Sequence, residues 1–376
     1  MSVCYLNPKS NIFVTLNHYP HKLNYKLKLN KMKKGSLLVC LSLFSLMAFS
    51  QNDVVQFLKG GEAGKADANK LFQAYMEPYA FALGDGLNNG WYSSAKTHSL
   101  FGFDFTVGVT GVQVPDDAKT FDINKLGLTN IVVKSGGNIA PTVAGESDSR
   151  PLLSVKNSPI EFNSPQGTGM DIVPVPLLQV GFGLLPHTDI IGRFVPEMKY
   201  DNNGDEMKIG FWGIGAKHNF MEWIPVLNKL PFDASLFGSY SEVNGQSELN
   251  SLAIPYIEFA NDGKQLLKIN TKTTKLGLVV SKKFSIITVF GGIGQSTSKS
   301  NIDLVGKYTI VTTFNVAGQE VTTRETLTDP VDVPFKTSNI SLDAGLRVKI
   351  TLLSLFASIN KSEYTSLNVG LSLGFR

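Results

Sequence analysis

The C-terminal residues of this chain alternate strictly between apolar and small or polar side chains. Apolar residues stand at every second position from Leu367 to Phe375, with Asn, Gly or Ser between them. A period of two predicts a β-strand with two unlike faces. A soluble sandwich shows the same alternation, so the pattern alone does not say whether the apolar face meets a core or lipid. The run of about ten residues favours a tilted membrane strand, because soluble strands have ~5–6 residues.

The same alternation recurs along the chain and predicts ten strands, an even number. We place them near residues 100–114, 175–185, 189–200, 206–217, 232–243, 265–281, 284–299, 338–350, 352–360 and 365–375. With the C-terminus on the periplasmic side, the long segments 115–174, 244–264 and 300–337 all fall on the outer side, as outer-membrane barrels require. We therefore expect an all-β fold, a transmembrane antiparallel β-barrel of 10–14 strands with an N-terminal helical segment. A further hairpin between residues 131–134 and 152–156 would raise the count from ten to twelve.

A secretory signal peptide precedes the barrel. Residues 32–34 are Met-Lys-Lys, and an apolar run over residues 37–49 follows them. This run is too short to cross a bilayer as a helix, which needs ~20 residues. It ends in a small-x-small cleavage pattern, and we place the cut after Ser50. The expected organisation is an upstream or untranslated extension at 1–31, with a genuine long leader as the alternative, a signal peptide at 32–50, a helical plug or periplasmic segment at 51–90, and the barrel at 91–376.

The leader also distorts the apparent charge of the protein. Of the 35 basic residues, seven lysines lie in positions 1–50, which hold no acidic residue, so the mature chain has 28 basic and 31 acidic residues and a net charge of −3. Overall charge therefore gives no support for a nucleic-acid partner. Both cysteines, Cys4 and Cys40, lie in the leader, which excludes a disulfide scaffold, a thiolate metal site and a Cys nucleophile from the mature chain.

The mature chain shows no motif for catalysis or metal binding. Its histidines, His98, His187 and His218, have no partner at the helical spacing of a metal pair, and no HExxH motif occurs. We expect them to be surface residues, and we expect no enzyme activity, no catalytic, metal or cofactor-binding residues and no cofactor. A membrane-embedded hydrolase that pairs Ser with one of these histidines stays as an alternative.

An amphipathic helix precedes the first strand. Its apolar stripe contains Pro78, and Gly84 and Gly86 are expected to end the helix. Two positions remain open for this helix, inserted in the barrel mouth as a plug or packed beneath it, and a helix that merely fills space is an equal alternative. The candidate plug residues are Leu71, Phe72, Tyr75, Met76 and Tyr79.

Charged side chains on the predicted inner faces form the candidate lumen lining. They are Asp104, Asp343, Arg347 and Lys349. A Lys or Arg against lipid costs ~2–4 kcal/mol at the bilayer midplane, so these positions must face the lumen or an interface. We expect them to pair with one another and hold the lumen rigid rather than to bind a specific ligand.

Five stretches together resemble an uncharacterised Bacteroidota family, a domain of unknown function, of outer-membrane β-barrel proteins. They are the leader ending in Ser-Gln, NNGWYSSAKTH, PVPLLQVGFGLLPHTDIIGRFVP, KIGFWGIGAKHNF and the closing LSLGFR. The resemblance covers nearly all of residues 51–376 and implies location and architecture but no substrate. The order of a helical segment followed by a barrel is also distantly similar to the FadL-type transporters of hydrophobic compounds.

These observations favour a channel or transporter for small hydrophobic molecules in the cell outer membrane. The alternative is a structural or interaction barrel whose outer loops bind a partner. The expected partners are outer-membrane lipids, the assembly machinery that reads the C-terminal strand, and a small hydrophobic ligand.

Overall fold

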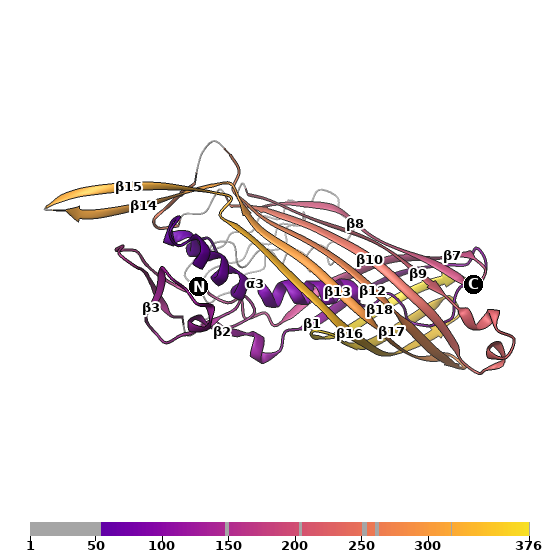
Figure 1. The fold of residues 1–376 in the computed structure, drawn as a ribbon. Helices are drawn as coiled ribbons and strands as arrows, with labels where there is room; N and C mark the ends of the chain where they lie inside the picture. Colours follow the sequence, from indigo (N-terminus) through magenta and orange to yellow (C-terminus); the bar gives the residue numbers. More distant parts are fainter. Residues whose placement is uncertain are drawn as a thin grey trace, which may run out of the picture. The chain divides into compact units, whose positions relative to one another are not determined.

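A computed structural model describes residues 54–146, 150–202, 205–249, 254–259, 263–316 and 318–375. The expected extension at 1–31 and signal peptide at 32–50 lie outside the described residues. The fold is all-β, and ten antiparallel strands close into a barrel (Figure 1). In chain order the barrel strands are β1 Phe103–Gln113, β7 Ile172–Leu185, β8 Thr188–Asn202, β9 Asp205–His218, β10 Asp233–Glu248, β12 Leu266–Phe284, β13 Ile287–Val305, β16 Val331–Ile350, β17 Leu353–Lys361 and β18 Thr365–Phe375.

The first strand closes the barrel on the last. β1 pairs with β18 from Phe103 opposite Phe375 to Gln113 opposite Thr365, and its other edge pairs with β7. All ten strands expected from the alternation are present, each antiparallel to its neighbours. The expected β-barrel is therefore confirmed.

The alternation places apolar side chains outside the barrel. On β18, Leu367 and Leu373 are 56% and 52% exposed, whereas Asn368 and Ser372 are 0% and 2% exposed. Exposed apolar residues occupy outward positions on other strands too, including Phe105, Val180, Phe194, Ile214, Leu236, Leu276, Ile293, Leu346 and Leu355. This is the reverse of a soluble core and matches a lipid-facing band around a polar interior.

The two ends of the barrel differ (Figure 1). At the short-turn end, hairpins turn at residues 186–187, 285–286 and 351–352, and β9 and β10 are joined through η4 Phe220–Trp223 and η5 Leu227–Lys229. At the long-loop end, long connections join β1 to β7, β10 to β12 and β13 to β16. This asymmetry is the one expected from the strand positions.

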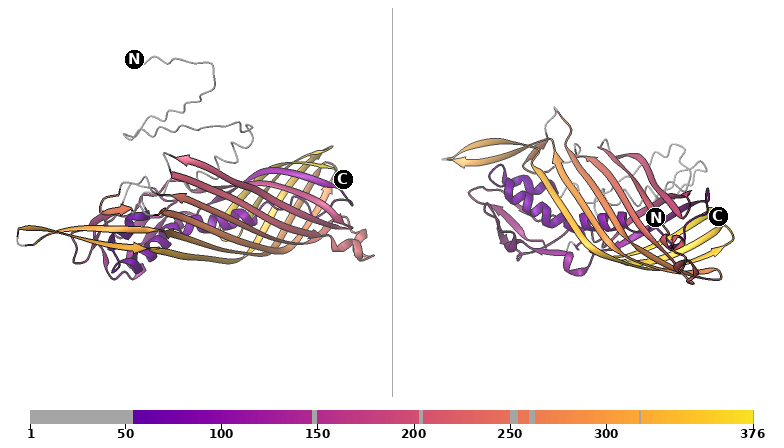
Figure 2. Two further views of the ribbon diagram at one scale, coloured as in Figure 1. Left: turned by 90° about the horizontal axis from the view of Figure 1, so that it is seen from above. Right: turned by 45° about the vertical axis from the view of Figure 1, so that its right-hand side comes forward.

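The long connections carry small sheets of their own. β2 Thr120–Asp122 pairs with β4 Ile139–Pro141, and η2 Asp116–Ala118 and η3 Ile123–Leu126 flank β2. β3 Ile131–Ser135, β5 Leu152–Val155 and β6 Glu161–Asn163 form a second sheet, while β11 Ile257–Phe259, β14 Lys307–Val316 and β15 Gln319–Thr328 form a third. The hairpin expected from residues 131–134 and 152–156 therefore exists, but outside the barrel, which keeps ten strands instead of twelve. The β14–β15 hairpin projects well beyond the barrel wall (Figure 2).

The barrel wall is uneven in height. β16 has 20 residues and β17 only nine, and β17 pairs with β16 only from Leu342 to Ile350. Residues 331–341 of β16, toward the long-loop end, therefore have no partner strand on that side. The barrel wall therefore extends less far toward the long-loop end at the turn between β17 and β18 than at β16.

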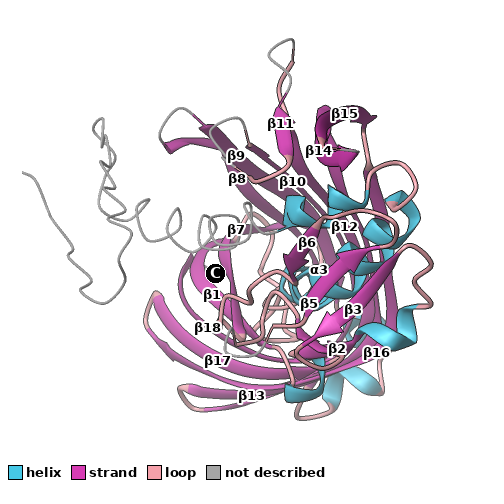
Figure 3. Cartoon of the chain, turned by 90° about the vertical axis from the view of Figure 1, so that its left-hand side faces the viewer, coloured by secondary structure: helices cyan, strands magenta, loops and turns pink. Residues whose placement is uncertain are grey.

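The N-terminal part consists of η1 Val55–Gly60 and α3 Lys65–Asn88, and α3 lies within the curve of the barrel strands (Figure 3). The prediction that Gly84 and Gly86 end the helix is wrong, since α3 continues to Asn88. A Cβ at Gly84 would lie 2.2 Å from Ser298 Oγ, and one at Gly86 would lie 2.4 Å from Val175 Cγ2. Both glycines therefore let the helix approach the wall closely. Among the described residues, no helix combines the length and the apolarity needed to cross a bilayer.

Candidate functional site

The chain that follows α3 runs through the inside of the barrel to the short-turn end. We call residues 89–102 the lumen segment. It starts with Asn89, whose side chain bonds Ser366 of β18, and ends beside β7, where the Phe101 N–H donates to the Gly183 carbonyl at 2.8 Å. Small buried polar residues on the inward faces leave room for the segment: Ser235, Ser241, Thr271, Thr273, Ser281, Ser296, Ser358, Asn368 and Ser372.

Arg193 of β8 holds the start of the lumen segment. Its guanidinium donates to the carbonyls of Leu87 and Asn89 at 3.0 and 2.8 Å, and to Gln179 Oε1 at 3.1 Å. The same group lies 3.8 Å from the centre of the Trp91 ring. No carboxylate in the described part of the chain pairs with Arg193. The partial negative charge on the last carbonyls of α3 therefore faces this buried cation.

A second cluster joins the lumen segment to three strands. Lys275 Nζ lies 2.9 Å from Asp343 Oδ2, and the same carboxylate oxygen accepts from the Tyr92 hydroxyl at 2.8 Å. Asn360 donates to Asp343 Oδ1 at 2.8 Å and to Ser341. Because Asp343 is shared between a cation, a phenol and an amide, it links β12, β16 and β17 to the segment.

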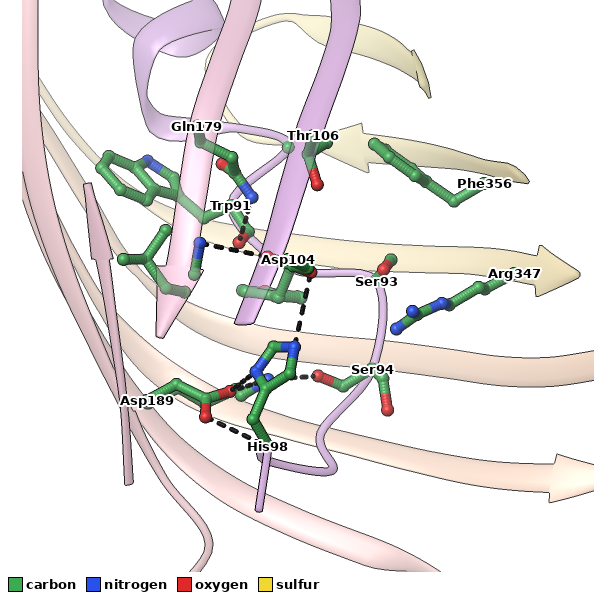
Figure 4. A pocket seen from close by; sticks show the side chains of 15 residues that line it. Trp91, Ser93, Ser94, His98, Asp104, Thr106, Gln179, Asp189, Arg347 and Phe356 are labelled. Atoms are coloured by element: carbon green, nitrogen blue, oxygen red, sulfur yellow. Dashed lines mark hydrogen bonds and ion pairs between the residues drawn. The ribbon is translucent and has the colours of Figure 1, made fainter. Parts of the chain in front are cut away.

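A third cluster lies near the short-turn end and is drawn in Figure 4. The His98 N–H donates to Asp189 Oδ1 at 2.8 Å, and its ring Nδ1 lies 3.1 Å from Asp189 Oδ2. On its other side, His98 Nε2 lies 3.7 Å from Asp104 Oδ2. Lys217 Nζ lies 3.2 Å from Asp189 and donates to the carbonyls of Ser94 and Lys96. His98 is thus held between two carboxylates.

A small cavity remains beside the third cluster. Ser93, Arg347 and Phe356 contribute to its lining (Figure 4), and its volume is about 30 Å³. This volume holds about one water molecule. The cavity is therefore too small for an organic solute.

The four candidate lumen-lining residues lie on inward faces, and three of them have identified partners elsewhere in the interior. Asp104 faces His98, Asp343 faces Lys275 and Tyr92, and Arg347 donates to Ser354 Oγ at 2.9 Å. Lys349 is half-buried near the short-turn end, where its backbone N–H bonds the Ile286 carbonyl at 2.8 Å. The sequence pattern identified these charges without their partners.

The candidate plug residues lie at the long-loop end of α3. Leu71, Phe72 and Tyr75 are fully buried, and Met76 and Tyr79 are nearly so. They pack in one core with residues of the long connections, including Ile131, Leu153 and Tyr308. This stripe fixes the helix to the loops over the barrel mouth. The lumen itself is filled by the end of α3 and by the lumen segment. The barrel begins only at Phe103, so residues 91–98 of the expected barrel domain lie inside the barrel and not in its wall.

Sequence reasoning missed several of the buried groups. Arg193, Lys217, Lys275 and Asp189 are absent from the predicted set, although each stands at a buried, inward position of a barrel strand. The expectation that His98 lies on the surface is wrong, since only 8% of it is exposed. His187 and His218 are half-buried at the short-turn end. In the described part of the chain, no group of three His, Cys, Asp or Glu side chains is placed to hold a metal ion.

Comparison with known families gives one match over most of the chain. The sequence model described as "Family of unknown function (DUF6588)" matches residues 32–375. No curated protein matches the chain.

Solved outer-membrane structures are similar to the chain at low identity. The attachment invasion locus protein Ail of Yersinia pestis is 9% identical, with 74% of this chain and 100% of that chain covered and a TM-score of 0.24. The outer membrane protease OmpT from Escherichia coli is 10% identical, with 75% and 100% covered and a TM-score of 0.30. A mutant of the monoaromatic hydrocarbon channel TodX is 11% identical, with 73% and 68% covered and a TM-score of 0.25. Likeness at this level assigns no activity.

Proposed function

The chain belongs to this family of unknown function (DUF6588), and we propose that it is a non-enzymatic outer-membrane barrel that admits a small molecule through a lumen closed at rest by residues 54–102. The outward apolar faces support the membrane location, because side chains such as Leu276 and Ile340 are 67% and 66% exposed on the barrel wall. The likeness to FadL-type transporters and the Bacteroidota origin are parts of the same proposal.

One observation carries the transport role: the lumen segment is attached to the wall mainly through polar bonds. Trp91, Tyr92 and Ala95 pack in an apolar cluster with the wall, and hydrogen bonds and ion pairs to Ser, Asn, Asp, Lys and Arg attach the segment elsewhere. Water replaces such bonds at a net cost of ~0.5–1.5 kcal/mol for each neutral bond and ~1.5–3 kcal/mol for each bond to a charged group. A polar wall can therefore become a wet pore once the segment moves.

Conductance in planar bilayers tests this role directly. The mature chain should stay mostly closed, whereas a variant that lacks residues 54–98 should show a steady open conductance. Because that deletion could impair folding, Trp91→Ala in the complete chain provides a second test, with Trp223→Ala, at a residue 64% exposed at the short-turn end, as the matched control. Closed behaviour of both folded variants would refute transport.

An interaction role is the second candidate, and the β14–β15 hairpin favours it. Every β15 residue except Leu327 is exposed, and the hairpin projects beyond the barrel (Figure 2). A folded barrel that stays non-conducting after the deletion, together with a partner that crosslinks at Glu320 of β15, would favour this role over transport.

A further inference from the structure

A groove separate from the lumen opens at the long-loop end, above the low part of the barrel wall. Its volume is about 440 Å³, and three parts of the chain line it: α3 around Pro78, the connection after β1 around Phe121, and the β17–β18 turn around Tyr364. This volume falls within the ~300–1,000 Å³ range of small-molecule sites. The groove can therefore hold an organic molecule, which the lumen cavity cannot.

Aromatic rings supply the apolar part of the groove. Phe81 of α3, Phe121 of β2 and Tyr364 all line it, and the Phe81 and Tyr364 rings lie 6.3 Å apart. Phe81 is also fixed by an edge contact with Phe335 of β16 at 6.5 Å. Rings held in this way provide a rigid apolar surface for a ligand body, and their faces attract cations.

Carboxylates supply the charge. Glu77, Asp117 and Glu363 line the groove, against Lys361 as its one lysine. No basic side chain in the described part of the chain forms an ion pair with Glu77 or Asp117, and Glu363 accepts a hydrogen bond from Asn339. Burial, and then the neighbouring Glu363, raise the pKa of Glu77. Burial, and then Glu77, Glu363 and other carboxylates, likewise raise the pKa of Tyr364. The groove lining therefore carries three carboxylates and one lysine, an excess of negative charge.

A backbone carbonyl adds a hydrogen-bond acceptor to this lining. Pro78 lies inside α3 and has no N–H, so it cannot donate the helical hydrogen bond to the carbonyl of Ala74, four residues earlier. Ala74 and Pro78 both line the groove. The Ala74 carbonyl thus lacks its helical donor in a residue that lines the groove, and an ammonium group could supply the missing hydrogen bond.

The carboxylates do not form a metal site, because no described group of three donors is placed to hold a metal ion. We propose that the groove binds a small organic cation with an apolar body, of the aromatic alkylammonium class, and that this is the class of molecule the barrel takes up. The statement about uptake rests on the proposed transport function, whereas the statement about binding in the groove does not. Rings hold the body, and Glu77, Glu363 and the Ala74 carbonyl hold the cationic group.

Binding to the purified mature chain tests the ligand class. Phenylpropylammonium, phenylpropanol and 4-phenylbutyrate share one phenylpropyl body and carry a positive, no and a negative charge. Titrations followed by saturation-transfer NMR should show the ammonium compound binding tightest and the carboxylate weakest. An ammonium compound that binds no tighter than the alcohol would overturn the proposal.

Variants locate the site. The double variant Glu77→Gln/Glu363→Gln should weaken the ammonium compound about 3- to 10-fold, as expected for two partly exposed charge pairs, and leave the alcohol unchanged. Phe121→Ala should weaken both compounds. Glu206→Gln, in β9 and outside the groove, is the matched control. Unchanged ammonium binding in the double variant would refute the groove as the site.

Conductance of the barrel without residues 54–98 separates the two proposals. If the deletion variant conducts but the complete chain does not prefer the ammonium compound, the proposed ligand class is wrong and the transport function stands. A chain that binds the ammonium compound in the groove but never conducts would keep the groove and remove both transport and the uptake statement.

Discussion

Arg193 stacks on Trp91 in the interior of the barrel, with its guanidinium carbon 3.8 Å from the centre of the indole ring. The same guanidinium bonds the Leu87 and Asn89 carbonyls, so one side chain of the wall fixes both the end of α3 and the start of the lumen segment. The pair therefore joins β8 to two successive parts of the chain in the lumen.

Replacing Arg193 should loosen the lumen segment. Arg193→Gln removes a desolvated cation–π contact and hydrogen bonds from a charged donor, and it also relieves the cost of burying that charge, so we expect a net loss of about 2 kcal/mol. The measurement is the temperature of the heat-modifiable shift in gel mobility. Arg324→Gln is the control, because Arg324 pairs with Glu258 on the exposed hairpin and such pairs contribute ~0–1 kcal/mol. Equal changes of the transition temperature in the two variants would show that Arg193 does not stabilise the lumen segment.

Adding a methyl group at Gly84 should push α3 from the wall. Alanine is favoured over glycine in a helix by ~1 kcal/mol, but a Cβ here would lie 2.2 Å from Ser298 Oγ and 2.6 Å from Ser298 Cβ. Overpacking of this kind costs about 1–3 kcal/mol, so Gly84→Ala should lower the same transition temperature. Gly84→Ala/Ser298→Gly should recover most of the loss. Gln73→Ala, on the exposed side of α3, is the matched helical control. A stabilised Gly84→Ala variant would contradict the close approach.

Asp85 should make the docking of α3 depend on pH. Burial raises its pKa to about 6 from an ordinary 3.8, although the Tyr364 N–H bonds its carboxylate at 2.7 Å. The folded state then holds a proton that the unfolded state releases, so stability falls as pH rises from about 4 to about 6, by at most about 3 kcal/mol. Asp85→Asn keeps an acceptor for Tyr364 and should show a smaller fall over this window, because the contributions of the other carboxylates remain in both proteins. Transition temperatures that change equally with pH in both proteins would count against this assignment.

The two ends of the barrel should be labelled from opposite sides of the outer membrane. The mature chain has no cysteine if the leader is cut after Ser50, so single cysteines can be introduced cleanly. A membrane-impermeant maleimide should label Glu62→Cys, at the long-loop end, on intact cells. It should label Val226→Cys, at a residue 75% exposed at the short-turn end, only after the outer membrane is opened. The reverse pattern would invert the proposed orientation.

The barrel could be predicted from sequence because its strands obey a local rule. Outward positions such as Leu367 and Leu373 must be apolar and inward positions such as Asn368 polar, so each strand can be identified without knowledge of its neighbours. The same rule applied to Arg193, which precedes the outward Phe194, would have added it to the charges found inside the barrel.

The lumen segment could not be predicted in the same way. Residues 89–102 show no period, because their conformation is fixed by partners far away in sequence, such as Asn360 for Asn89 and Asp343 for Tyr92. The end of α3 was missed for a related reason. A glycine that ends a helix and a glycine that lets a helix touch a wall look alike in sequence, and only Ser298 and Val175 distinguish them.

The lumen segment also bears on the order of assembly. Residues 54–102 run from the long-loop end through the ring of strands to the short-turn end, where β1 starts. A helix with side chains is ~10–12 Å wide, and the finished lumen keeps a cavity of only about 30 Å³. Passing α3 through a completed ring would need the ring to be empty and wide, so we infer that the ring forms around a chain already in place. A ring that closes in this way has its lumen filled from the moment of closure.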